Sequence, residues 1–140
     1  MTRVCIVGKN ESIRESLLSY ETARRALSAY DIAEPFNNAI AIDTVSLGAA
    51  ISLLNDLDWY LARTAKEAWV REPSIDEEEW LSRDLATAIR DGAVDPEGNH
   101  DRRVYKSENG TLTGPVRTSP DIDPNELEGD DGIVIVRGLD

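Results

Sequence analysis

The spacing of the apolar residues changes along the chain, and this change limits the possible folds more than any other feature. Residues 3–8 form a short apolar run that ends at a glycine, which is typical of a buried strand. From residue 12 the apolar residues recur every three or four positions, as on one face of a helix. A second short apolar run follows at residues 39–45. This order predicts a βαβ unit with two parallel strands and a helix near 12–30.

Two further helices are predicted from apolar periodicity and capping residues. The longest apolar stripe begins after Ser46 and predicts a helix near 46–71, about 38 Å long. So long a helix exceeds what a small core uses, and we expect part of its stripe to meet a partner. A Ser74–Glu77 capping box and Gly92 as a C-cap predict a third helix near 76–91.

The last third of the sequence predicts strands and an acidic loop. Asn109-Gly110 stands between β-type residues and indicates a hairpin with strands near 103–107 and 111–116. Residues 119–131 carry acids and prolines with few apolar side chains, which predicts a mobile loop. A final strand near 132–137 is expected to join the sheet. The predicted fold is therefore one α+β (or α/β) domain over 1–140: a small mixed sheet with about three packed helices, starting with a βαβ unit.

The charge of the chain favours a salty environment, and an acidic protein from an ordinary environment is the alternative. The 140 residues carry 27 acids and 15 bases, a net charge of −12, and only three of the bases are lysines. A surface rich in carboxylates and poor in lysine stays hydrated in concentrated salt, where screening also weakens self-repulsion. The same acidity disfavours nucleic acid as a partner. A lone cysteine and the lack of any long apolar run predict a cytoplasmic protein without a membrane span.

Two turns between a predicted strand and a predicted helix are candidate anion or small-molecule sites. Backbone amides at such junctions can hold a phosphate or a carboxylate. Neither turn has the glycine pattern of a nucleotide-binding loop. The candidate residues are Gly8, Lys9, Ser12, Thr44, Ser46 and Gly48.

A polar and aromatic stretch within the predicted long helix is the candidate protein interface. It contains Asn55, Asp58, Trp59 and Tyr60. Large aromatic side chains concentrate binding energy at interfaces, so Trp59 and Tyr60 are the strongest candidates.

No catalytic residue, metal ligand set or cofactor is predicted. Cys5 lies in an apolar strand, where a buried and unreactive thiol is expected. His100 is the single histidine and stands in a polar loop, so a histidine-rich metal site is excluded. No serine is framed by the nucleophile-elbow pattern of hydrolases.

Residues 44–61, together with Glu79–Arg90 downstream, resemble a family of small uncharacterised proteins from halophilic archaea. The similarity extends from residue 1 to about residue 115. The resemblance implies salt adaptation and a cytoplasmic location, and it brings no site residues with it.

These observations rank three hypotheses for function. A non-enzymatic interaction or regulatory module comes first, with an unknown protein partner or self-association. A small-molecule or anion-binding domain is the alternative, and an enzyme or a DNA-binding protein comes last.

Overall fold

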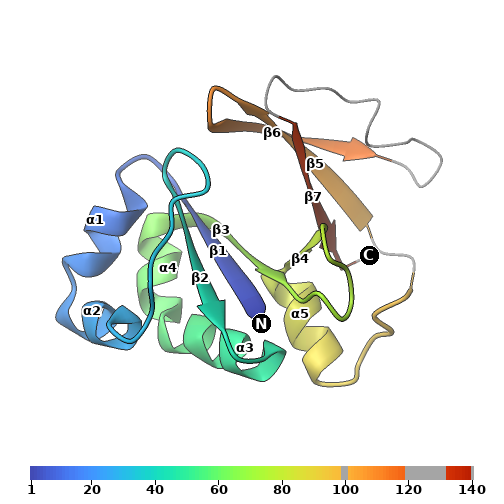
Figure 1. Ribbon diagram of the computed structural model, residues 1–140, viewed down its shortest axis with the longest axis horizontal. Coiled ribbons are helices and arrows are strands. Elements are labelled where there is room, and N and C mark those ends of the chain that lie inside the picture. Colours follow the sequence, from blue (N-terminus) through green and yellow to red (C-terminus); the bar gives the residue numbers. More distant parts are fainter. Residues whose placement is uncertain (99–100, 119–131, 140) are drawn as a thin grey trace.

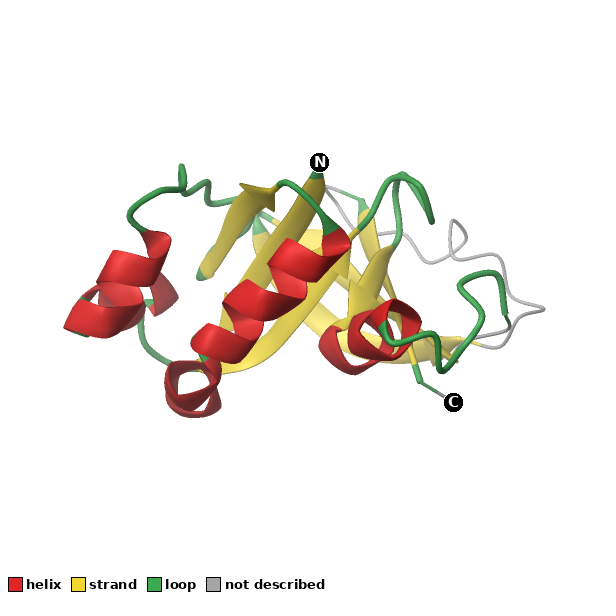
Figure 2. Cartoon of the chain, turned by 90° about the horizontal axis from the view of Figure 1, so that it is seen from below, coloured by secondary structure: helices red, strands yellow, loops and turns green. Residues whose placement is uncertain are grey.

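One curled sheet runs through the chain, and the helices lie on one side of it (Figures 1 and 2). The computed structural model describes residues 1–98, 101–118 and 132–139. Within these residues the sheet has seven strands in the order β2-β1-β3-β4-β7-β5-β6. β4 and β7 are parallel and every other neighbouring pair is antiparallel. The strands are β1 (Thr2–Gly8), β2 (Ala39–Thr44), β3 (Ala65–Arg71), β4 (Trp80–Ser82), β5 (Asp101–Glu108), β6 (Thr111–Thr118) and β7 (Ile133–Gly138).

Five short helices cover the sheet face to which Val4, Ile6 and Val70 contribute. These strand residues and the buried faces of the helices form the larger core, in which Leu17, Ile51 and Leu54 are almost fully buried. The helices are α1 (Ile13–Leu18), α2 (Glu21–Leu27), α3 (Leu47–Asp56), α4 (Asp58–Thr64) and α5 (Arg83–Arg90).

The opposite face of the sheet holds a second, smaller core. Because side chains alternate along a strand, Cys5 and Trp69 point away from the helices. The sheet curls into a half-barrel, so that Tyr105 of β5 reaches Trp69 of β3, with ring centroids 4.9 Å apart. Trp80 and Val136 complete this inner core. The central strands are therefore buried on both faces.

The predicted fold class is wrong in both its sheet and its helices. The sheet is large, with seven strands, and five short helices replace the expected three. The opening segment is not a βαβ unit, because β1 and β2 are antiparallel, with Val7 opposite Ala39. A single helix over 12–30 would have carried the chain to the far end of the sheet. Instead Tyr20 is extended between α1 and α2, and the two short helices fold back to where β1 ended.

The predicted helix near 46–71 is also wrong. Ser46 does cap a helix, but α3 ends at Leu57 and a separate α4 continues to Thr64. The remainder is strand β3, where Trp69 faces the inner core and Val70 faces the helices. The apolar spacing of these residues is compatible with a helix and also with a strand that is buried on both faces. Hydrogen-bonded pairing with β1 and β4 stabilises the strand.

The predicted helix near 76–91 begins seven residues too early. Trp80–Ser82 is a strand, because Trp80 enters the inner core while Leu81 enters the helix-side core. The helix cap is Ser82, whose Oγ accepts from the amide of Leu85 at 3.2 Å, and not Ser74. Gly92 follows the end of α5 with a φ of 73°, so its predicted capping position is confirmed.

The predicted strands are confirmed, and so is the hairpin. Asn109 and Gly110 both have positive φ and join β5 to β6. The last apolar run, β7, joins the sheet, as expected, and it lies between β4 and β5. The predicted acidic loop at 119–131 lies outside the described residues.

Candidate functional site

Three aromatic rings gather where α4 meets the connection between α1 and α2. The ring centroid of Tyr20 lies 5.8 Å from that of Trp59 and 5.0 Å from that of Tyr60. The Trp59 and Tyr60 centroids are 5.1 Å apart. The guanidinium carbon of Arg63 stands 3.5 Å from the Trp59 ring centroid, and its Nη1 donates to the Trp59 carbonyl at 2.8 Å. We call these four residues the aromatic surface.

Breaks in the helices create this arrangement. Tyr20 has an extended backbone between α1 and α2, which turns its ring towards α4. The interruption of the helix at Leu57 buries Leu57 and starts α4, so that Trp59 and Tyr60 lie in its first turn. Neither break is marked in the sequence by a glycine or a proline, since the two positions are Tyr20 and Leu57. Tertiary packing therefore determines where these helices end.

Trp59 differs from the other two rings in its exposure. Tyr20 and Tyr60 are partly buried against the helix-side core, whereas 53% of Trp59 is exposed. Trp59 belongs to neither core cluster. Its ring is nevertheless fixed in place by two tyrosines and a stacked arginine, an interaction worth about 0.5–1 kcal/mol at an exposed site. The fold therefore presents a rigid indole that its cores do not use.

The two polar residues of the predicted interface point elsewhere. Arg83 of α5 donates through Nη2 to Asn55 Oδ1 at 3.1 Å, and its Nη1 lies 2.7 Å from Asp58 Oδ1. Arg83 also donates to the Leu54 carbonyl at 3.3 Å. Asn55 and Asp58 therefore join α3 and α4 to α5, while Trp59 and Tyr60 belong to the aromatic surface.

Sequence reasoning missed Tyr20, Arg63 and Arg83. Arg63 stands four residues after Trp59, one helical turn away, and this spacing could have identified it. Tyr20 and Arg83 come from distant segments, and no local pattern connects them to α4.

The first predicted anion turn has most of its donors engaged within the chain. The amides of Gly8 and Lys9 donate to the carbonyls of Asn38 and Thr64, at 2.8 and 3.1 Å. Ser12 caps α1 by accepting from the amide of Glu15 at 3.3 Å. The structure brings the Lys9 ammonium to α4, where it donates to the Ala62 carbonyl at 3.1 Å. Lys9 thus lies beside the helix that carries Trp59.

The second predicted anion turn is built as a helix cap. Ser46 Oγ accepts from the amide of Ala49 at 3.1 Å. Thr44 is buried, and its hydroxyl lies 2.9 Å from the Thr2 carbonyl, to which it donates. Gly48 lies in the first turn of α3, close to Ser46. Anion binding at this turn stays a prediction.

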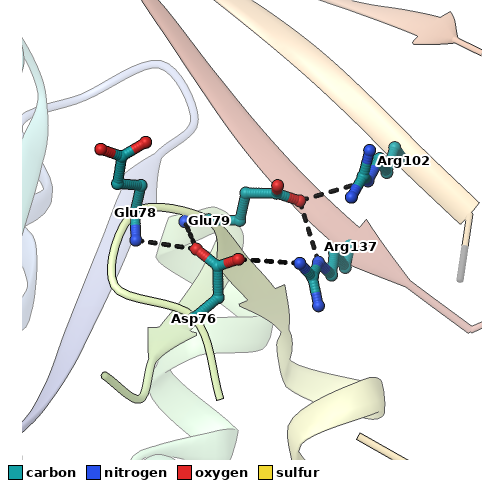
Figure 3. Close-up of polar contacts among 5 residues, drawn as sticks. All are labelled: Asp76, Glu78, Glu79, Arg102 and Arg137. Carbon is teal, nitrogen blue, oxygen red and sulfur yellow. Dashed lines mark hydrogen bonds and ion pairs between the residues drawn. The ribbon is translucent and has the colours of Figure 1, made fainter. Parts of the chain in front are cut away.

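A network of two acids and two arginines ties the β3–β4 connection to β7 and β5 (Figure 3). Arg137 Nε lies 2.9 Å from Glu79 Oε1, and Arg137 Nη2 lies 2.8 Å from Asp76 Oδ2. Arg102 Nε approaches the same Glu79 oxygen at 3.2 Å. Burial alone would raise the pKa of Asp76, but amide hydrogen bonds from Glu79 and Glu78 and the Arg137 charge lower it below 3.8. Each charge in the network is paired, so we assign it to stability.

The inner core also contains the Tyr105 hydroxyl and the Cys5 thiol. The Tyr105 hydroxyl donates to Glu67, whose other oxygen lies 3.2 Å from Arg103 Nη1. Burial, the bond to Glu67 and the Glu67 charge raise the pKa of Tyr105 well above its usual range. Burial likewise raises the pKa of Cys5 to about 12, against the smaller opposing effect of two nearby arginine charges. The expected burial of Cys5 is confirmed.

The described part of the chain shows neither a metal ligand set nor a membrane-spanning helix. Within residues 1–98, 101–118 and 132–139, no three or more His, Cys, Asp or Glu side chains are grouped to hold a metal ion. None of the helices in these segments has the length and apolar character to cross a membrane. His100 lies outside the described residues.

Comparison with known proteins identifies one family. Residues 2–106 match a family of unknown function, DUF5804, and the match contains all four residues of the aromatic surface. Searches of curated proteins and of solved structures gave no significant match. Since the matched segment covers well over half of the 140 residues, the chain belongs to the family of unknown function DUF5804.

Proposed function

We propose that this protein is a non-enzymatic interaction module that binds a partner protein through the aromatic surface. The observation that supports this proposal is that Trp59 is 53% exposed while its ring contacts Tyr20, Tyr60 and Arg63. Tyr20, Tyr60 and Arg63 hold the ring, and neither core requires it.

The physical case rests on the low cost of using a ring that is already fixed. A partner that covers Trp59 gains the burial of a large aromatic side chain without ordering a flexible one. Tryptophan, tyrosine and arginine are the residue types that most often dominate interfaces, where loss of one anchor costs about 2 kcal/mol or more. All three types meet at this surface.

We further propose a salty cytoplasm as the working environment, as in halophilic archaea. A net charge of −12, with three lysines among 15 bases, supports this setting. At molar salt the Debye length is about 3 Å, so distant charges act weakly and direct apolar contacts gain weight. A partner bound through Trp59 would remain bound under such conditions.

Affinity capture with matched variants tests the proposal. Wild-type protein, Trp59→Ala and Val45→Ala are immobilised and exposed to native lysate of the source cells in molar potassium chloride. Val45 is an apolar residue that is 81% exposed, so its truncation controls for the loss of exposed apolar surface in general. We expect a stoichiometric protein retained by the wild type and by Val45→Ala but lost with Trp59→Ala. Equal retention by all three variants would contradict the proposal.

A further inference from the structure

A small cationic hollow lies beside the aromatic surface. Lys9 follows β1 and Arg63 belongs to α4, and folding brings them to the same place: the Lys9 amide donates to the Thr64 carbonyl at 3.1 Å. The hollow has a volume of about 300 Å³, near the lower limit of ligand pockets. Its lining consists of Lys9, Asn10, Glu11, Ser16, Arg63 and Thr64.

The two cations of this hollow have no carboxylate partner among the described residues. Lys9 Nζ donates to the Ala62 carbonyl at 3.1 Å, and Arg63 donates to the Trp59 carbonyl at 2.8 Å. Each of these groups has further donors, since an ammonium has three and a guanidinium five. Donor capacity therefore remains for an outside ligand.

The charge of the hollow is opposite to that of the whole chain. Two cations, Lys9 and Arg63, face one carboxylate, Glu11, which gives a local charge of +1 in a chain of net charge −12. The hydroxyl of Ser16 and the amide of Asn10 add uncharged donors. A carboxylate is the group that complements this set in charge and in hydrogen bonding.

We infer that the hollow accepts an Asp or Glu side chain from an acidic segment of the partner protein, while an adjacent apolar residue of that segment covers Trp59. Arg63 connects the two contacts, because it lines the hollow and stacks on the Trp59 ring at 3.5 Å. This inference rests on the proposed function and names the chemistry of the partner.

A protein segment fits these observations better than other anions. A free inorganic anion fills a cationic hollow but leaves the Trp59 indole exposed. A nucleic acid brings many phosphates, and a chain of net charge −12 offers them two cations at this place. One carboxylate next to an apolar side chain satisfies the hollow and the indole together.

The test uses a display library of random short peptides as the probe, selected on the wild type, Lys9→Glu, Lys66→Glu and Trp59→Ala. Lys66→Glu is the matched control, since Lys66 is exposed, lies outside the hollow and changes the net charge by the same amount. We expect the wild type and Lys66→Glu to enrich peptides with an acid beside an apolar residue. For one such peptide, Lys9→Glu weakens binding by about tenfold or more, and so does replacing its acid by the amide.

The possible outcomes separate this inference from the proposed function. Two results would overturn the acidic-partner inference and leave the interaction module standing. In the first, the selected peptides require Trp59 but are not enriched in acidic residues. In the second, they bind Lys9→Glu and Lys66→Glu equally. Peptides that bind Trp59→Ala as tightly as the wild type would contradict the proposed interaction module itself. A library that yields no binder also overturns the inference. So does a wild-type dimer in sedimentation that is lost with Lys9→Glu, because a second copy of the chain would then occupy the site.

Discussion

Asp76 shows how much one side chain contributes to joining distant parts of this fold. One carboxylate oxygen accepts from the amides of Glu78 and Glu79 at 2.8 and 2.7 Å, and the other pairs with Arg137. The first two contacts shape the connection between β3 and β4, and the third attaches it to β7. The capping-box pattern at Ser74 assigned this acidic stretch to a helix, so sequence reasoning gave Asp76 no role.

The lowered pKa of Asp76 predicts an acid-labile contribution to stability. Because the folded state holds the ionised carboxylate, the contribution is present above pH 3.8 and is lost as the pH falls through the folded pKa. Asp76→Asn is expected to lower the free energy of unfolding by about 1–2 kcal/mol at neutral pH, and by less in acid. Urea unfolding at several pH values measures this difference, with exposed Glu77→Gln as the control. A loss that stays constant down to pH 3 would argue against the assigned role.

The burial or exposure of single residues was predicted correctly where the neighbouring sequence determines it. Cys5 is buried, as its apolar strand indicated. Trp59 is exposed beside Tyr60, on the stretch assigned to an interface, although its role there remains a proposal. Asn55 and Asp58 pair with Arg83, some 25 or more residues away in the sequence, and such a contact requires the packing of α3, α4 and α5.

At the level of elements, the apolar pattern located most strands but assigned two of them to helices. Trp69 and Val70 in β3, and Trp80 and Leu81 in β4, are buried on opposite sheet faces. Consecutive buried residues do not show the alternation by which a half-buried strand is recognised. The inner core, created by the curl of the sheet, is what makes both faces apolar. Local periodicity contains no information about that curl.

The position of the α5 cap provides a direct test of this element. Ser82 Oγ accepts from the Leu85 amide, so Ser82→Ala should destabilise the protein by about 1 kcal/mol. Ser74 has the competing sequence pattern but is exposed, and its hydroxyl donates to Glu72 Oε1 at 3.1 Å. Ser74→Ala should therefore lower the free energy of unfolding by only a few tenths of the loss expected for Ser82→Ala. Thermal unfolding of the two variants compares them, and a larger loss for Ser74→Ala would support the longer helix instead.

At the level of the whole molecule, net charge links the fold to its proposed environment. The chain carries 27 acids and 15 bases, and folding brings these charges close together. Salt screens their repulsion, since the Debye length falls from about 10 Å at 0.1 M to about 3 Å at 1 M. The composition was visible in the sequence, whereas the half-barrel that carries the charges was not.

The charge predicts a stability that rises with salt. The midpoint of thermal unfolding should increase steadily as potassium chloride is raised from 0.1 M to molar concentrations, because screening relieves repulsion and high salt strengthens apolar burial. Calorimetry at a series of salt concentrations measures the midpoint directly. A midpoint that does not change with salt, or falls, would remove the support for a salty working environment.

Binding through Trp59 is the central claim, and one titration tests it most directly. The protein retained in affinity capture is purified and titrated by calorimetry into the wild type, Trp59→Ala and Val45→Ala, each shown by circular dichroism to be folded. Because the Trp59 ring lies outside both cores, we expect Trp59→Ala to stay folded while its Kd rises by about 30-fold or more. Val45→Ala should bind as the wild type does. A Kd for Trp59→Ala within threefold of wild type would contradict the account.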